Sequence, residues 1–448
     1  MIKVKTYDYR RLHDLRFYII ALFTILYFIC SKHLISGVKI IYTHPYITSD
    51  GYDWLVEAEY ILNYLGGNVG PNKLVILRQP GYVVTLMIDH IFGGTGKSLT
   101  IINTLLFGGL LTSLFGCMKE LKFSKILQSV GILIFCFSPL IGNFFAIFAE
   151  LQSMTFMYFS LWMILLYLKS GSLNKLLLIL ATVSSILGGI TKTYCLLPIL
   201  FFATYNFFES IKKRKLGHLT LAAIISSLSF ILIEFFWRYV PHRGTPSTFS
   251  LLFPTTKIPP MVLDAFLLGI LPLLPVIIIS LFYRPWKQIS TWVLHFTGIA
   301  LTLLCLYSWW DSRFFLVFYP VFIFFGLSFW SSIPNTKRLK SSLMGIGFAL
   351  FVYMFVANTI KSVIILDFRF REFSKVEFNK STEGITLPPH WAAQILQSKG
   401  IKDRFNLMEK CGALVMCRQA ASTYQTPSKY ETSVMKFYFE VFKDKILP

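Results

Sequence analysis

Two charged side chains stand in apolar surroundings, where an isolated charge is costly. Glu150 lies in the stretch Phe148-Ala149-Glu150-Leu151, and Lys192 follows a pair of glycines in the middle of another apolar block. A carboxylate can take a proton from a hydroxyl, and an ammonium can bind a phosphate through charge-assisted hydrogen bonds. We expect each side chain to face a cavity or an opposite charge, although Glu150 also fits a simple acid at the positive end of a helix.

Two further acids lie in the run Thr48-Ser49-Asp50-Gly51-Tyr52-Asp53-Trp54. Asp50 fits an N-cap, because an aspartate at a helix start accepts hydrogen bonds from the first free backbone amides. The same carboxylate, held at a membrane surface, could act as a general base. The two interpretations are compatible, and Asp53 is the competing candidate for the base.

Several cations are expected on the same side of the membrane as these acids. Any one of them could simply extend to the lipid headgroups. As a set they suit a lipid phosphate, because the outer side of a membrane protein is normally poor in Lys and Arg. The set consists of Arg78, Lys192, three residues of the 237–260 loop (Arg238, His242 and Arg243), and Arg313 after Trp309-Trp310-Asp311-Ser312.

The composition indicates which elements must position these charges. Hydrophobic residues make up 55% of the chain and charged residues 15%, against about 45–50% and about 25% in soluble domains. This excludes an ordinary soluble enzyme, a coiled coil and a disordered chain. The net charge of +21 does not predict a nucleic-acid partner, because most Lys and Arg residues occupy short gaps between apolar blocks. A divalent metal is possible but unsupported, because no paired ligand spacing surrounds His242 or His390.

We predict an all-α polytopic membrane protein with about eleven transmembrane helices, since a bilayer core takes about 20 apolar residues per helix. Basic residues in alternate gaps place the N-terminus in the cytoplasm and the C-terminus outside. One stretch, 176–208, is too long for one span, so Gly188, Gly189 and Lys192 are expected to divide it into a hairpin. The predicted spans are 16–35, 98–118, 126–142, 151–168, 176–190, 193–208, 219–236, 261–282, 289–308, 314–332 and 341–365.

Two parts of the chain lie outside these spans. The first external loop, 36–97, should carry interfacial helices, one from Asp50 to Leu65 ended by Gly66-Gly67 and one from Pro80 to Phe92. The apolar side of the first helix consists of Trp54, Leu55, Ala58, Ile61, Leu62 and Leu65. The spans and this loop form a transmembrane domain over 1–365, and 366–448 is expected to be a small extracytoplasmic segment. Its Cys411 and Cys417 either form a disulfide or remain reduced thiols.

The order of these features resembles the GT-C membrane glycosyltransferases, the broad group with protein O-mannosyltransferases, aminoarabinose transferases and RgtA-like enzymes. The resemblance covers about positions 15–325, and the 366–448 segment has no counterpart. Asp311 and Phe314 stand where the late motif of the family commonly has Glu and Tyr. The matching segments are Asp50-Gly51-Tyr52-Asp53-Trp54, Arg78-Gln79-Pro80-Gly81-Tyr82, Ala149-Glu150-Leu151, Gly188-Gly189-Ile190-Thr191-Lys192-Thr193, and Ser312-Arg313-Phe314 through Pro320.

The resemblance implies transfer of a sugar from a polyprenyl-phosphate donor to a glycan, lipid or protein hydroxyl on the external face, with inversion. It implies a bacterial plasma membrane protein without a cofactor. Asp50 would be the base, Glu150 would assist or bind the sugar, and Lys192 and Arg313 would hold the phosphate, with Arg78 ordering the interfacial loop. Two alternatives remain: a transporter or flippase of lipid-linked sugars, which also needs buried charges, and a catalytically inactive scaffold with the same fold.

Overall fold

The helices that position the candidate residues occupy the N-terminal half of the chain. The structure is a computed structural model. It describes residues 15–34, 54, 58, 61–62, 65–67, 79–92, 97–138, 141, 144, 149–170, 174–204, 217–239, 316–317, 319–321, 323–324 and 326–328. All regular structure in these ranges is helical: α1 Leu15–Leu34, α3 Pro80–Ile91, α4 Lys97–Glu120, α5 Lys125–Cys136, α6 Glu150–Lys169, α7 Lys175–Gly189, the 3-10 turn η4 Thr193–Leu196, and α9 His218–Tyr239.

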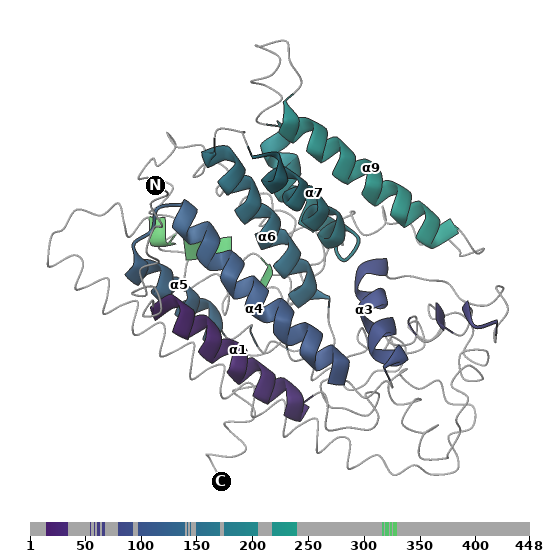
Figure 1. The fold of residues 1–448 in the computed structure, drawn as a ribbon, viewed down its shortest axis with the longest axis horizontal. Coiled ribbons are helices and arrows are strands. Elements are labelled where there is room, and N and C mark those ends of the chain that lie inside the picture. The colour runs from purple at the N-terminus through teal and green to yellow at the C-terminus, as the bar shows by residue number, and fades with distance from the viewer. Residues whose placement is uncertain are drawn as a thin grey trace, which may run out of the picture.

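Five long helices lie side by side in a row, in the order α1, α4, α6, α7 and α9 (Figure 1). Helices α4 and α6 run in the same direction, because Glu120 at the end of α4 forms an ion pair of 2.9 Å with Lys169 at the end of α6. Helix α3 lies at the other ends of these helices, where α4 and α6 begin and α7 ends. There, Asp89 of α3 accepts a hydrogen bond from the Leu99 amide of α4 at 3.0 Å. The candidate residues Glu150 and Lys192 lie at this end.

Small and hydroxylated residues join α6 to α7. Ser160 and Ser185 are 2.7 Å apart across the interface, and Ser184 donates to the carbonyl of Phe156 at 2.8 Å. Such residues let helices approach closely and hydrogen-bond where lipid offers no alternative partner. These contacts join α6 to α7, and the turn that follows α7 lies beside the first turn of α6.

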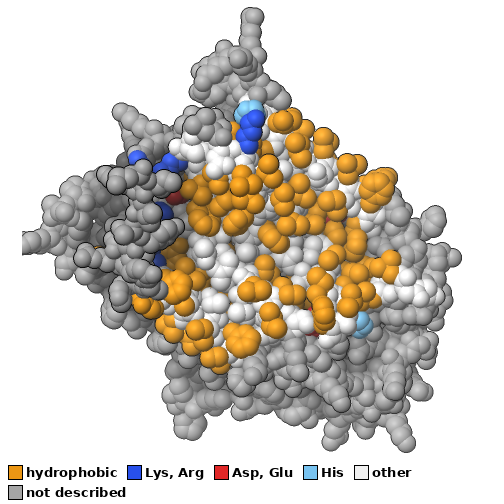
Figure 2. Space-filling model, in the orientation of Figure 1, with side chains coloured by type: hydrophobic (Ala, Val, Ile, Leu, Met, Phe, Trp, Pro, Cys, Tyr) orange, Lys and Arg blue, Asp and Glu red, His pale blue; other side chains and the backbone are white. Residues whose placement is uncertain are grey.

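Large apolar side chains cover the outer faces of the row. Phe17 of α1, Leu105 of α4 and Phe236 of α9 are each more than half exposed. Figure 2 shows hydrophobic side chains over most of the described surface on this face, with Lys, Arg and His near its margins. Three helices are long and apolar enough to cross a membrane: Ser98–Glu120, Glu150–Lys169 and His218–Trp237. Apolar patches of this extent suit contact with lipid, and the chain is an integral membrane protein.

Among the described spans, one difference from the sequence-based expectations is found in α5. The 176–208 stretch is broken as expected: α7 ends at Gly189, and helix resumes at Thr193. Helix α5, however, ends at Cys136, although we expected its span to continue to residue 142. Pro139 explains the early end, because a proline disfavours helical backbone at the residue before it. At 12 residues, α5 is about 18 Å long.

The described residues of 36–97 include helical positions in both segments where we expected helices. Trp54, Ala58 and Ile61 are helical and buried. The helical residues give way to a turn at Gly66-Gly67, where Gly67 has a φ of 74°, a left-handed conformation that commonly ends a helix. Leu65, expected on the buried side of this helix, is 69% exposed. The second segment is α3, with a proline in its first turn.

Several predictions lie outside the described residues. They are the spans 261–282, 289–308 and 341–365, most of 314–332, the segment 366–448 and the state of Cys411 and Cys417. The membrane sides of the two termini also stay predictions. Within 314–332, the described residues between 316 and 328 are helical.

Candidate active site

The structure describes two of the seven predicted site residues. Glu150 is the first residue of α6, and Lys192 lies between α7 and η4. The other five lie outside the described residues, and their roles stay predictions: Asp50, Asp53, Arg78, Arg243 and Arg313.

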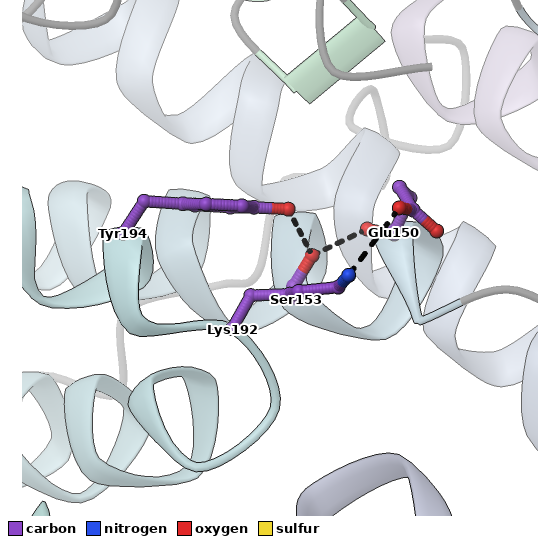
Figure 3. A network of polar contacts seen from close by, with 4 residues as sticks. All are labelled: Glu150, Ser153, Lys192 and Tyr194. Atoms are coloured by element: carbon purple, nitrogen blue, oxygen red, sulfur yellow. Dashed lines mark hydrogen bonds and ion pairs between the residues drawn. The ribbon is translucent and has the colours of Figure 1, made fainter. Parts of the chain in front are cut away.

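Glu150 and Lys192 form an ion pair. Lys192 Nζ lies 3.7 Å from Glu150 Oε1, and the side chains are 20% and 1% exposed, respectively (Figure 3). Glu150 also lies at the N-terminus of α6, whose dipole favours a carboxylate. Each charge therefore faces an opposite charge, and the position of Glu150 also fits the alternative of an acid at a helix start.

Lys192 lies in a tight turn between α7 and η4, and the backbone around it explains why the helix is interrupted there. Helix α7 ends at the glycine pair, and the Lys192 amide donates to the carbonyl of Gly188 at 2.8 Å. Lys192 itself is extended, with φ −154° and ψ 122°, and it caps η4. A Cβ on Gly188 would lie 2.8 Å from Cys195 Cβ, so only glycine permits this close turn.

An aromatic pair borders the ion pair. Lys192 Nζ lies 5.8 Å from the ring centroid of Trp54, within the range of a cation–π contact. Trp54 in turn meets Tyr82 of α3 edge to face, with 5.3 Å between ring centroids. The sequence predicted Trp54 only as an apolar helix residue; its nearness in sequence to Asp50 and Asp53 was the available signal.

Tyr82 contributes a neutral hydroxyl to this region. Burial raises the pKa of the Tyr82 phenol well above its usual value, and the nearby negative charges of Glu150 and Asp89 raise it further. The group therefore stays protonated at physiological pH and can donate a hydrogen bond. Sequence analysis included Tyr82 in a motif but assigned it no role.

The start of α3 is attached directly to the turn that carries Lys192. The Gly81 amide donates to the Ile190 carbonyl at 2.9 Å, and Gln79 Nε2 donates to Thr193 Oγ1 at 2.6 Å. A Cβ on Gly81 would lie 2.9 Å from Thr191 Cα, so the two backbones meet where Gly81 has no side chain. Two segments more than 100 residues apart therefore form one structural unit.

Polar contacts connect the same turn to α6. Ser153 Oγ donates to the Glu150 carbonyl at 2.9 Å and lies 3.2 Å from the Tyr194 hydroxyl (Figure 3). The thiol of Cys195 donates to the Ser153 carbonyl at 3.3 Å. Ser153 and Tyr194 had no signal in the sequence beyond their proximity to Glu150 and Lys192.

The arrangement brings together a cation, Lys192, a carboxylate, Glu150, and the aromatic rings of Trp54 and Tyr82, of which Tyr82 also has a neutral hydroxyl. Such a group can hold a phosphate and accept or orient a hydroxyl. Within the part of the chain that the structure describes, no group of three His, Cys, Asp or Glu residues could hold a metal ion.

Comparisons with known proteins give distant structural likeness and no match in sequence. No protein-family model matches the sequence, and no curated protein matches it. The chain is similar to the crystal structure of ArnT from Cupriavidus metallidurans bound to undecaprenyl phosphate, with 13% identity and a TM-score of 0.49. The alignment covers 90% of this chain and 75% of the ArnT chain. We therefore infer function from the residues of this chain.

Proposed function

We propose that this protein is a membrane glycosyltransferase that transfers a sugar from a polyprenyl-phosphate-linked donor to a hydroxyl acceptor on the external face. One observation carries the proposal: the described residues of four sequence segments that resemble the GT-C motifs meet around the Lys192–Glu150 pair. These residues are Trp54, Gln79 to Tyr82, Glu150 and the turn from Gly188 to Thr193. Charged side chains among apolar helices are costly to place, and such pairs commonly mark a substrate or ion site.

The reaction assigns a role to each group. The acceptor oxygen attacks the anomeric carbon from the face opposite the phosphate, and the bond between that carbon and the phosphate oxygen breaks with its electron pair. The anomeric configuration is inverted. Lys192 stabilises the charge that the polyprenyl phosphate gains on leaving, with Arg313, Arg78 and Arg243 as further cations. The phosphate remains on its lipid, so both donor and product stay in the membrane.

The proton of the acceptor hydroxyl needs a base within about 3 Å. Asp50 is our choice, and Asp53, the residue before Trp54, is the competitor. Glu150 assists or binds the sugar, because it forms an ion pair with Lys192, the proposed phosphate ligand. Both aspartates immediately precede or lie near Trp54 in sequence, and the Trp54 ring contacts Lys192.

A transfer assay with polyprenyl-phosphate sugars in proteoliposomes tests the proposal. We expect purified protein to move radiolabelled sugar to a hydroxyl acceptor and to release polyprenyl phosphate in equal amount. Movement of intact lipid-linked sugar across the bilayer without transfer would favour the transporter. Absence of both activities over a panel of donors and acceptors would favour the scaffold. The proposed setting is the bacterial plasma membrane, with the N-terminus inside and the C-terminus outside.

A further inference from the structure

A buried amide lies where α3, α6 and the turn after α7 meet. Gln152 follows Glu150 by two residues in α6 and is 7% exposed. Its Oε1 accepts from the Thr85 hydroxyl of α3 at 2.8 Å. Its Nε2 donates to the Gly81 carbonyl at 3.1 Å and to Thr191 Oγ1 at 3.3 Å. Gln152 therefore contacts both elements that meet beside Lys192.

The direction of each hydrogen bond follows from its partners. The Gly81 carbonyl can only accept, so the amide nitrogen of Gln152 must face it. The Thr191 hydroxyl donates its proton to the Leu187 carbonyl at 2.8 Å, so its oxygen accepts the hydrogen bond from Gln152 Nε2. The chain of donors thus runs from Thr85 through Gln152 and Thr191 to the backbone of α7. A glutamine suits this point because it has a donor and an acceptor on one planar group.

The consequence for the ion pair is geometric. Thr191 immediately precedes Lys192, and Gln152 lies in the same helical turn as Glu150. Residues two apart on a helix do not face each other, so the first turn of α6 holds the Lys192 turn through two separate contacts. One is the charge contact from Glu150, and the other is the neutral amide contact from Gln152.

We propose that Gln152 is a positioning residue that holds Lys192 beside Glu150 and over Trp54. The inference rests on the proposed function in one respect: Lys192 is taken as the cation for the lipid phosphate. Gln152 acts through Lys192 and does not itself touch the phosphate. Loss of the amide leaves the charges in place but lets the Lys192 turn shift, because the Gln152 side chain bonds to Gly81, Thr85 and Thr191 at once.

Trp54 provides a readout that needs no activity, because Lys192 Nζ lies over its ring. The full-length protein is labelled with 5-fluorotryptophan in detergent micelles, and the Trp54 resonance is assigned with Trp54→Phe. Lys192→Met sets the size of the shift that follows loss of the ammonium. We expect Gln152→Met to move the Trp54 resonance by a comparable amount.

Gln128→Met is the matched control. Gln128 is also a buried glutamine, bonded to the Phe123 carbonyl at 2.6 Å and to Arg16 at 2.7 Å, and it lies on α5. It should leave the Trp54 resonance in place. Thr85→Val should act like Gln152→Met, whereas Thr85→Ser keeps the hydroxyl and should act like the wild type. If Gln152→Met does not fold, the comparison of Thr85→Val with Thr85→Ser tests whether the hydrogen bonds of Gln152 position Lys192.

A second arm measures the affinity for polyprenyl phosphate in the same preparations. We expect Gln152→Met to weaken binding by less than the loss of about tenfold or more expected for Lys192→Met, because Gln152 acts on the phosphate only through Lys192. A Trp54 resonance that Lys192→Met moves and that Gln152→Met and Thr85→Val leave unchanged would overturn the inference. If the resonance moves as expected but wild-type protein binds no polyprenyl phosphate, the positioning of Lys192 stands and the proposed function fails.

Discussion

Lys192, in the turn between α7 and η4, forms an ion pair with Glu150, the first residue of α6, with its Nζ 3.7 Å from Glu150 Oε1. The two residues lie at the end of the helix row opposite the Glu120–Lys169 pair, which links the far ends of α4 and α6. Among the described residues, an acid–lysine pair therefore lies at each end of α6. The pairs differ in exposure: Lys192 is 20% exposed and Lys169 is 66% exposed.

This difference predicts unequal costs of removing the acids. Glu150→Gln leaves a largely buried ammonium without its carboxylate, so the unfolding temperature in detergent should fall. Glu120→Gln should cost less, because water screens the exposed Lys169. The double-mutant cycle of Glu150→Gln with Lys192→Met should give a coupling energy of about 1 kcal/mol. Equal losses at the two ends, or no coupling, would contradict the ion pair.

The close contact of Gly81 with the Lys192 turn predicts a strong effect of one methyl group. Gly81→Ala places a Cβ against the backbone of Thr191, which cannot move aside as a flexible side chain can. We expect a loss of about 2 kcal/mol, typical of overpacking, and weaker donor binding. Gly109→Ala is the control, because its Cβ would meet only Thr155 Cγ2, at 3.4 Å. Thermal unfolding of both variants measures the difference, and equal stability would contradict the close approach.

The choice of base is tested by two substitutions that preserve shape. Asp50→Asn keeps capping ability and removes the basic carboxylate, so turnover should fall by about 100-fold or more with normal expression. Asp53→Asn should have a smaller effect. Initial rates of sugar transfer give the comparison. If Asp53→Asn abolishes transfer while Asp50→Asn retains it, Asp53 is the base.

The predicted topology can be tested independently of activity. The alternation of basic gaps places Lys215 in the cytoplasm and Lys380 outside. Reporter fusions after these two residues should report opposite sides of the membrane. A cytoplasmic signal from the fusion after Lys380 would require a different number of spans.

The sequence was sufficient for most of the described helices and for singling out Glu150 and Lys192, for identifiable physical reasons. Lipid demands long apolar blocks, so α1, α4, α6 and α9 could be read from hydropathy. The break after α7 followed from two glycines and a lysine within one block. Glu150 and Lys192 were recognisable because a charge in an apolar stretch needs a reason.

The rest of the site could not be read in this way, because it depends on which elements meet. Gln152 is a neutral polar residue within an apolar helix, and nothing local distinguishes its role from that of Gln128. The contact of Gly81 with Ile190 joins residues far apart in sequence. The early end of α5 was missed because hydropathy outweighed the effect of Pro139 on the preceding residue.

The most direct test of the central claim compares the two lysines that flank α6. The measurement is the dissociation constant for polyprenyl phosphate, with wild-type protein, Lys192→Met and Lys169→Met in nanodiscs. We predict that Lys192→Met weakens binding by at least about tenfold, since the phosphate loses a charge-assisted hydrogen bond worth about 1.5–3 kcal/mol. Lys169→Met, which removes an equal charge at the other end, should bind as the wild type does. Equal affinities for all three proteins would contradict a phosphate site at Lys192.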